Sequence, residues 1–309
     1  MPLPGINNSS GPPAIRYTPL AARLSFRNIA GMTRLAKPTS HLPLTTSKKM
    51  NIHFYKYQGT GNDFVILDNR DGRYNDLTKE QVKDICDRRF GIGADGLMML
   101  NEKAGYDFEM KYYNSDGGES SMCGNGGRCL VMFAHHAGIR KNLYHFIASD
   151  GPHEAEIDAD GTVSLKMKDV NNIAEYGGDF LLDTGSPHYV KLISDVKTYD
   201  VYKKGHAIRN SEEFAEKGIN VNFVQQKSDF EIIVRTYERG VEDETWSCGT
   251  GVTAAALVCY HNETGYNDVT VLTKGGKLTV EFDRISDSHY TNIFLCGPAE
   301  KVYEGDIEI

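Results

Sequence analysis

The sequence predicts an α+β fold with a mixed β-sheet rather than a doubly wound parallel sheet. Short strand-like segments outnumber helix-like ones along the 309-residue chain, and this pattern does not fit regular strand–helix–strand crossovers. In addition, two segments around Cys123 and Cys248 resemble each other, 125 positions apart. Because the length suits about two domains, we expect a duplicated domain.

The elements begin at Met50. In the first strand, over 51–57, Ile52 and Phe54 face one way, and the strand breaks at 59–62. A helix is expected over 79–90, capped by Asp76 or Thr78. The other strand-like segments, most of them rich in β-branched or aromatic residues, are 64–69, 106–114, 162–167, 180–185, 188–193, 219–225, 230–238, 268–275, 277–282 and 292–297.

Composition excludes several classes of protein. Apolar residues make up 40% and charged residues 25%, which is ordinary for a globular protein. No apolar run approaches the roughly 18–20 residues that a membrane span needs. The six cysteines form no CxxC pair, which argues against a disulfide framework and common zinc patterns. We therefore expect free thiols, a reducing compartment and cytoplasmic localisation.

Residues 1–49 differ from the rest of the chain. They contain seven Lys or Arg, no acidic residue and seven of the ten prolines. This composition predicts a disordered N-terminal extension. It also allows an organelle transit peptide, and translation could instead begin at Met50. The other 260 residues carry 27 basic and 42 acidic side chains, so we expect neither nucleic acid nor a membrane as a partner.

The two similar segments each place a cysteine before Gly-polar-Gly and an apolar run. One reads SMCGNGGRCLVMFAHHAG from Ser121, and the other SCGTGVTAAALVCYHNETG from Ser247. An almost wholly apolar helix is a buried one, and Gly138 and Gly265 suit C-terminal caps. Each motif cysteine should therefore sit at the N-terminus of a buried helix.

A helix N-terminus offers free N–H donors and a partial positive charge, which lower the pKa of a thiol and attract an anion. Two such sites facing each other would place Cys123 and Cys248 on opposite sides of one carbon. One thiolate could then remove an α-proton while the opposite thiol delivers another. The helix ends would hold the adjacent carboxylate. Nothing in the sequence demands a cofactor or a metal.

The chain from Met50 to Ile309 resembles the diaminopimelate epimerase family of pyridoxal-independent amino-acid epimerases. The matching blocks, in order, are GTGNDFVILDN, RRFGIGADG, YNSDGGESSMCGNGGRC, DTGSPHYV, NVNFVQ and RTYERGVEDETWSCGTG. The resemblance implies two similar lobes, each a mixed sheet curled around a central helix, with the active site between them. It implies a first lobe of 50–168 plus about 300–309, a second lobe of 169–299, and a homodimer.

The resemblance also implies roles at matched positions. Cys123 and Cys248 would form the acid/base pair that converts LL- to meso-diaminopimelate, a precursor of lysine and peptidoglycan. His188 and Glu238 would tune the thiols, and a buried Arg239 would clamp the distal carboxylate. The matched substrate-binding positions are Asn62, Asn114, Gly124, Asn125, Ser186, Asn220, Glu238, Arg239, Gly249 and Thr250.

The chain departs from the family pattern at three places. Ser186 stands where many members have Asn, Gly96 where many have Gln, and the segment from Arg239 to Cys248 is one residue longer than in many relatives. All three concern the fit of the substrate rather than proton transfer.

Other interpretations stay open at this point. Cys86, Cys129, Cys259 and Cys296 suit core packing, and the pair His135–His136 suits a helix surface. A proline or hydroxyproline racemase would share the fold and the paired cysteines, but has Cys-Gly-His-Gly in its first motif. A non-enzymatic thiol redox or metal-binding protein is the other alternative.

Overall fold

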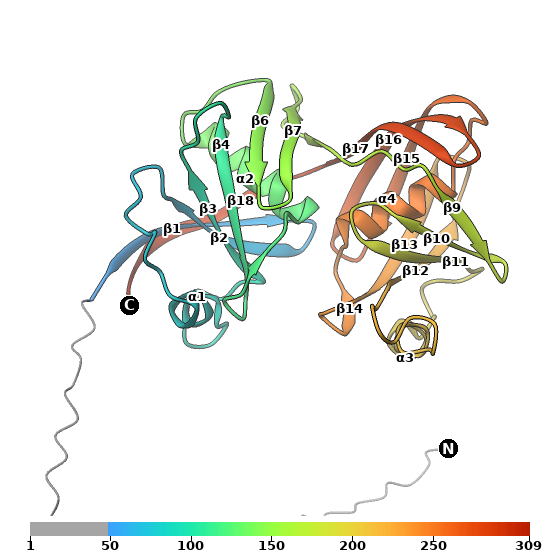
Figure 1. Cartoon of the computed structure of the whole chain (residues 1–309), viewed down its shortest axis with the longest axis horizontal. Helices are drawn as coiled ribbons and strands as arrows, with labels where there is room; N and C mark the ends of the chain where they lie inside the picture. The colour runs from blue at the N-terminus through green and yellow to red at the C-terminus, as the bar shows by residue number, and fades with distance from the viewer. Residues whose placement is uncertain (1–48) are drawn as a thin grey trace, which may run out of the picture. The chain divides into compact units, whose positions relative to one another are not determined.

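The computed structural model describes residues 49–309; the disordered extension or transit peptide expected over 1–49 therefore lies outside the described residues, apart from Lys49. The chain folds into two lobes, each with a long apolar helix among its own strands (Figure 1). The first lobe contains β1 (Asn51–Gly59), β2 (Asn62–Asp68), α1 (Lys79–Cys86), β3 (Gly96–Asn101), β4 (Phe108–Asn114), β5 (Glu119–Ser120), α2 (Gly124–His136), β6 (Leu143–Ala148), β7 (Gly151–Ile157) and β8 (Val163–Lys166).

The second lobe repeats this order of elements. It contains β10 (Asp179–Asp183), β11 (Pro187–Leu192), α3 (Val201–Arg209), β12 (Asn220–Gln226), β13 (Glu231–Glu238), β14 (Asp243–Thr245), α4 (Gly249–Val258), β15 (Gly265–Thr273), β16 (Gly276–Ser286) and β17 (His289–Gly297). The strand pairings repeat as well. For example, β2–β3 and β4–β6 are parallel, as are their counterparts β11–β12 and β13–β15. This repetition confirms the α+β, duplicated architecture.

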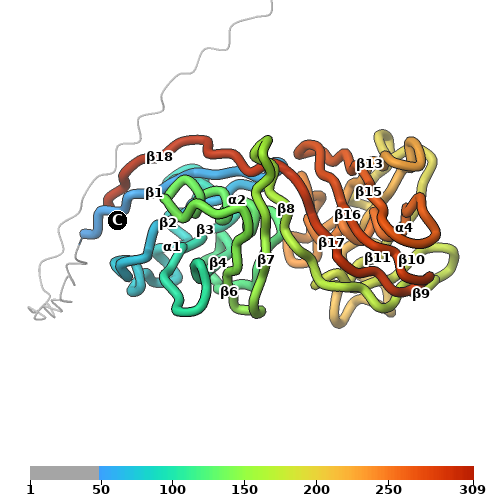
Figure 2. Tube along the Cα trace, turned by 90° about the horizontal axis from the view of Figure 1, so that it is seen from above, coloured from blue at the N-terminus to red at the C-terminus, as the bar shows by residue number. Residues whose placement is uncertain are grey.

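The two copies join through the edges of their sheets. The antiparallel strands β8 and β17 pair with each other and lie side by side in Figure 2. Two strands lie outside the repeat: β9 (Ile173–Tyr176) extends β10, and β18 (Glu300–Glu308) pairs with β1 along its whole length. The boundaries expected for the lobes, 50–168 with about 300–309 and 169–299, stay a prediction.

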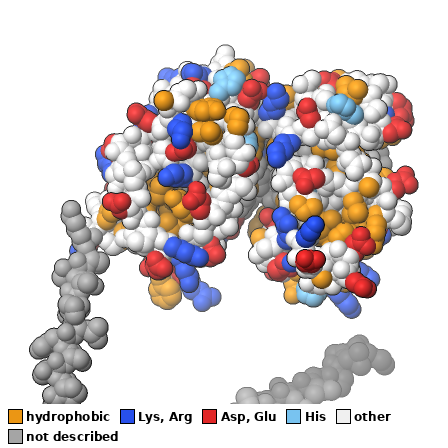
Figure 3. Space-filling view, in the orientation of Figure 1, with side chains coloured by type: hydrophobic (Ala, Val, Ile, Leu, Met, Phe, Trp, Pro, Cys, Tyr) orange, Lys and Arg blue, Asp and Glu red, His pale blue; other side chains and the backbone are white. Residues whose placement is uncertain are grey.

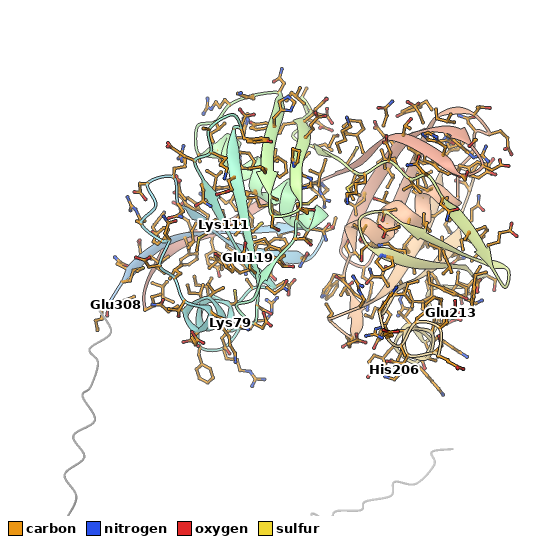
Figure 4. The ribbon with its side chains drawn as sticks, in the orientation of Figure 1. Lys79, Lys111, Glu119, His206, Glu213 and Glu308 are labelled. Atoms are coloured by element: carbon orange, nitrogen blue, oxygen red, sulfur yellow. The ribbon has the colours of Figure 1, made fainter. Side chains whose placement is uncertain are left out.

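Most of the core surrounds α2 and α4. The largest apolar cluster draws on both helices and the sheets around them, and two smaller clusters lie beneath α1 and α3. Figure 4 labels Lys79 on α1 and His206 on α3, the two short helices that cover the outer clusters. The central helices are thus held by apolar packing on all sides, which fixes the position of their N-termini.

The structure corrects two expectations and adds a helix that the sequence did not predict. The helix α1 begins after Thr78 in a capping box but ends at Cys86 rather than 90, because the Asp87 carboxylate accepts hydrogen bonds from the N–H groups of Arg89 and Phe90. Gly138 follows α2 with φ +98°, as a helix cap requires, but Gly265 instead begins β15. Helix α3 was not predicted, because its apolar residues form no sustained stripe.

The surface charges and the lengths of the helices can be compared with the expectation that neither nucleic acid, a membrane nor a metal is bound. On the face drawn in Figure 3, acidic and basic side chains are interspersed. Within residues 49–309, no helix is both long and apolar enough to cross a membrane, and no group of three or more His, Cys, Asp or Glu side chains is arranged to hold a metal ion.

Candidate active site

Cys123 and Cys248 are the N-cap residues of α2 and α4. Both have extended backbone conformations, with φ −102° and −112°, as N-caps do. The two helix ends abut, because a Cβ added to Gly249 would lie 3.4 Å from the Cα of Gly124. The structure therefore brings the two predicted cysteines to one place, from opposite lobes.

Glycine is required for this close approach. A Cβ on Gly249 would lie 2.9 Å from the side chain of Leu295, and one on Gly124 would lie 3.0 Å from the same side chain. The Asn125 side chain then links the lobes, since its Nδ2 donates to the Ser247 carbonyl at 3.0 Å. Without side chains at the first helical positions, the free N–H groups of both helices stay accessible to an anion.

Beneath the helix ends lies a buried guanidinium. Arg128 has no solvent exposure and donates to the Gly124 carbonyl at 3.3 Å and to Asn125 Oδ1 at 3.1 Å. It holds the first turn of α2 and the interlobe asparagine together. Sequence reasoning missed this residue, although a charge inside an otherwise apolar helix is an available signal.

On the first-lobe side, Asn62 connects the thiol to a carboxylate. Its Oδ1 lies 3.7 Å from the Cys123 sulfur, and its Nδ2 donates to Asp95 at 2.5 Å. Asp95 in turn pairs with Arg88. The predicted Asn114 ends β4 opposite Gly96 in the register, and the following residue donates its N–H to the Asp95 carbonyl at 3.1 Å. Asp95 was not predicted as part of this group.

On the second-lobe side, Thr250 lies against the other thiol. Its hydroxyl is 3.5 Å from the Cys248 sulfur, and its carbonyl accepts a hydrogen bond from Thr184 at 2.8 Å. This second contact ties the start of α4 to the loop that leads into β11. That loop carries Ser186 and is followed by His188 in β11.

His188 is completely buried. Its Nδ1 lies 3.1 Å from the amide nitrogen of Asn222, whose Oδ1 accepts from Thr236, so Nδ1 accepts and Nε2 carries the proton. The Nε2 atom has no partner within residues 49–309. Burial, followed by the charge of Arg239, lowers the pKa of His188 to about 3, so the ring is neutral. Asn222 was missed, although a polar residue within an apolar strand is a usable signal.

Ser186, Asn220 and Arg239 form one hydrogen-bonded group. Asn220 donates to the Ser186 hydroxyl at 3.0 Å and accepts from the Arg239 backbone N–H at 2.9 Å. The Arg239 guanidinium donates to the same hydroxyl at 3.3 Å. The expectation of a buried Arg239 is wrong, since this residue is exposed in the structure. It nevertheless sits where an incoming carboxylate could reach it.

The expectation of thiols with lowered pKa is also wrong. Burial raises the pKa of Cys123, and the N–H groups of Asn125 and Gly126 offset this only in part. Burial and then the charge of Glu238 raise the pKa of Cys248. Desolvation outweighs the helix terminus, because it penalises the thiolate over its whole surface. Both thiols are therefore neutral at pH 7 in this structure.

Glu238, at the end of β13, is a carboxylate whose charge affects the pKa of both thiols. Its charge raises the pKa of Cys123 as well as that of Cys248. Burial, and to a lesser degree Asp95, raises the pKa of Glu238 itself. Protonation of this one group would therefore change the acidity of both cysteines.

The other cysteines lie away from this group. All four are buried and free, and burial raises the pKa of each to about 12. Cys129 lies inside α2, but Cys259 is the C-cap of α4 rather than an interior residue. His135 and His136 contact the hydroxyls of Tyr144 and Tyr57 instead of forming a metal site.

Comparison with known proteins identifies the family. The family model described as diaminopimelate epimerase matches residues 54–173 and 180–302. A diaminopimelate epimerase of Flavobacterium psychrophilum is 49% identical over 254 residues, which cover 82% of this chain and 99% of that protein. One from Chlorobaculum tepidum is 43% identical over 260 residues, covering 81% and 99%.

Solved structures share the fold at low sequence identity. A phenazine biosynthesis protein of the PhzF family from Bacillus anthracis has a TM-score of 0.66 at 15% identity, covering 84% of this chain and all of that one. A hydroxyproline epimerase from Agrobacterium vitis has a TM-score of 0.59 at 12% identity, covering 84% and 93%. Together with the extent and identity of the sequence matches, the two cysteine-capped helices in one fold lead to one conclusion: the chain belongs to the diaminopimelate epimerase family.

Proposed function

We propose that this chain epimerises LL-diaminopimelate to meso-diaminopimelate without a cofactor, using Cys123 and Cys248 as its two bases. The observation that carries the proposal is the meeting of two cysteine-capped helix N-termini from opposite lobes. A planar carbanion bound between two thiol groups can be protonated on either face. The family and its relatives support the choice of substrate.

In the proposed reaction, the thiolate of one cysteine removes the α-proton, and the electron pair of the C–H bond passes into the adjacent carboxylate. The thiol of the other cysteine then protonates the carbon from the opposite face. The first cysteine ends as a thiol and the second as a thiolate, so the two must exchange their protonation states before the next turnover. The backbone N–H groups of Gly124, Asn125, Gly249 and Thr250 stabilise the charge that develops on the carboxylate.

Burial has a second consequence for this mechanism. A desolvated thiolate is a stronger base than a solvated one, because its conjugate acid has a raised pKa. The enzyme therefore holds a small population of a strong base instead of a large population of a weak one. In the proposal, Glu238 and the neutral ring of His188 set this population, Glu238 through its charge near both thiols.

The remaining predicted residues bind the two polar ends of the substrate. The contact of Asn62 with Cys123 supports a role for it at the reacting centre, with Asn114 beside it. The hydrogen-bonded group of Ser186, Asn220 and Arg239 supports a role at the distal end. There, the guanidinium of Arg239 can donate two parallel hydrogen bonds to a carboxylate.

The proposal extends to the setting of the enzyme. We infer a role in the synthesis of lysine and peptidoglycan precursors, a homodimer, and a cytoplasmic location or, where residues 1–49 act as a transit peptide, an organelle stroma. The lobe boundaries expected from the sequence belong to this proposal, and the pairing of β18 with β1 supports the return of 300–309 to the first lobe.

Incubation with LL-diaminopimelate in D₂O tests the proposal. We expect conversion to the meso isomer with deuterium at one α-carbon, in the presence of a chelator and without pyridoxal phosphate. Racemisation of proline instead would favour the racemase alternative, and a strict metal requirement would favour the metal-binding one. The hydroxyproline epimerase among the solved structures bears only on the fold at its 12% identity.

A further inference from the structure

Gly96 leaves a space beside the active site, and Tyr112 fills it. A Cβ at position 96 would lie 2.5 Å from Cε2 of the Tyr112 ring and 3.0 Å from its hydroxyl oxygen. Tyr112 pairs with Met98 in the antiparallel register, two positions from the pair Gly96–Asn114. The ring therefore leans along β3 toward the end that carries the site.

This placement brings the hydroxyl close to the reacting groups. Asp95, which precedes Gly96, accepts a hydrogen bond from Asn62, and Asn62 contacts the Cys123 sulfur. Burial and then the charges of Cys123, Asp95 and Glu238 raise the pKa of Tyr112. The Phe64 ring, against which Tyr112 packs, lies 3.5 Å from a Cβ built at Gly126 in the first turn of α2, so Tyr112 lies beside the helix end that carries Cys123.

The Tyr112 hydroxyl also lacks a hydrogen-bond partner among the described residues and is accessible to a ligand. Tyr112 is 9% exposed, with its ring packed edge-on against Phe64 at 6.0 Å between centroids. No hydrogen bond joins its oxygen to residues 49–309, and that oxygen is not among the fully buried, unpartnered atoms of these residues. A buried phenol normally has a partner. An accessible and unpaired one beside a reactive centre points to a ligand.

The structure assigns Tyr112 a direct contact with substrate: its hydroxyl oxygen accepts a hydrogen bond from the α-ammonium group at the reacting carbon. Asp95 is paired with Arg88, whereas Glu238 has no ion-pair partner within residues 49–309, so Glu238 supplies negative charge that favours a cation over the α-carboxylate. A neutral phenol supplies the acceptor without adding charge to the thiol pair. The inference rests on the proposed function, because it takes the amino-acid substrate from there.

Tyr112→Phe tests this contact, with Tyr113→Phe as the matched control. Tyr113 is the next residue in β4, and its side chain packs against the separate cluster beneath α1. In assays with LL-diaminopimelate, we expect Tyr112→Phe to lower kcat/KM about tenfold or more, mainly through KM, which is the loss expected for one hydrogen bond to a charged group. The melting temperature should stay near that of the wild type, and Tyr113→Phe should keep wild-type kinetics.

The outcomes separate this inference from the function on which it rests. If the wild type converts LL-diaminopimelate and Tyr112→Phe does so with the same kcat and KM, the contact does not exist. Equal losses in both variants, accompanied by lower melting temperatures, would also overturn it, because they would indicate a packing effect. A wild type that leaves LL-diaminopimelate unchanged would overturn the proposed function and this inference together.

Discussion

At the scale of single residues, the proposed reaction depends on the sulfur atoms of Cys123 and Cys248. Replacing Cys123 or Cys248 with Ser keeps the N-cap and the helix, but a hydroxyl is far harder to ionise than a thiol. We expect either substitution to lower the rate of epimerisation by about 10²–10⁴-fold, the range for loss of a general acid or base. Chiral analysis of the product over time gives this rate. Cys259→Ser, at the far end of α4, should keep its activity per folded molecule; a comparable loss there would contradict the assignment.

The raised thiol pKa values predict how activity depends on pH. Since burial raises the pKa of Cys123 and that of Cys248, the thiolate forms only as the pH rises above neutral. We therefore expect kcat/KM to rise from pH 7 toward pH 9, because this ratio reports ionisation of the free enzyme.

Glu238→Gln provides the matched comparison for this profile. It removes a charge that raises the pKa of both thiols, so the rising limb should move to lower pH even if the maximal rate falls. A limb that stays in place would show that Glu238 does not control the thiols.

Single residues also show where sequence reasoning stops. The positions of Cys123, Cys248 and their glycines followed from the motifs, because a helix N-terminus is a local feature. The direction of the thiol pKa shift did not, because it depends on burial in the folded chain. The exposure of Arg239 likewise depends on tertiary packing, since its contacts are with Ser186, Lys217 and Asn220. The position of Tyr112 beside Gly96 depends on the register between β3 and β4, which the sequence alone does not give.

At the scale of elements, the duplication was visible only in the two cysteine segments. Strands over 64–69 and 106–114 were predicted and are present as β2 and β4. Helices α1 and α3 occupy equivalent places after β2 and β11. Only α1 was predicted, because the residues of its Thr78 capping box can be recognised in the sequence. The equivalence of the copies lies in their strand pairing, which a single sequence does not display.

This equivalence provides a test of helix packing at the site. Gly126 and Gly251 each lie three residues after their cysteine. A Cβ on Gly251 would lie 2.3 Å from the Asn222 side chain, whereas one on Gly126 would meet the flexible Met98 sulfur at 3.1 Å. We expect Gly251→Ala to lower the free energy of unfolding by about 1–3 kcal/mol and to disturb the contact of Asn222 with His188. Gly126→Ala should cost clearly less in urea unfolding, and equal costs would contradict this account.

At the scale of the whole molecule, all residues of the proposed site lie between Asn62 and Thr250. Residues 1–49 contain none of the matched family blocks, which begin at Gly59. A chain that begins at Met50 should therefore keep its kcat and its melting temperature. A large fall in either value, measured on purified truncated and full-length protein, would show that residues 1–49 contribute to the folded enzyme.

The lobes also touch at the tips of two hairpins, beside the only tryptophan in the chain. The turn between β15 and β16 fits against the turn between β1 and β2 so closely that a Cβ on Gly275 would lie 1.7 Å from the Thr60 carbonyl oxygen. Gly275 also donates its N–H to the Trp246 carbonyl at 3.0 Å. Because backbone atoms cannot yield as a flexible side chain can, any substitution at Gly275 must push the two lobes apart at this point.

We therefore expect Gly275→Ala to lower kcat/KM while leaving the far-ultraviolet circular dichroism spectrum unchanged. Trp246 is 60% exposed and lies two residues before Cys248, so its fluorescence should report the altered contact with the first lobe. The control is Lys277→Ala, an exposed position two residues along the same hairpin, which should change neither property. If Gly275→Ala kept wild-type kinetics and emission, the fit of the two hairpin tips would not control how the lobes bring Cys123 and Cys248 together.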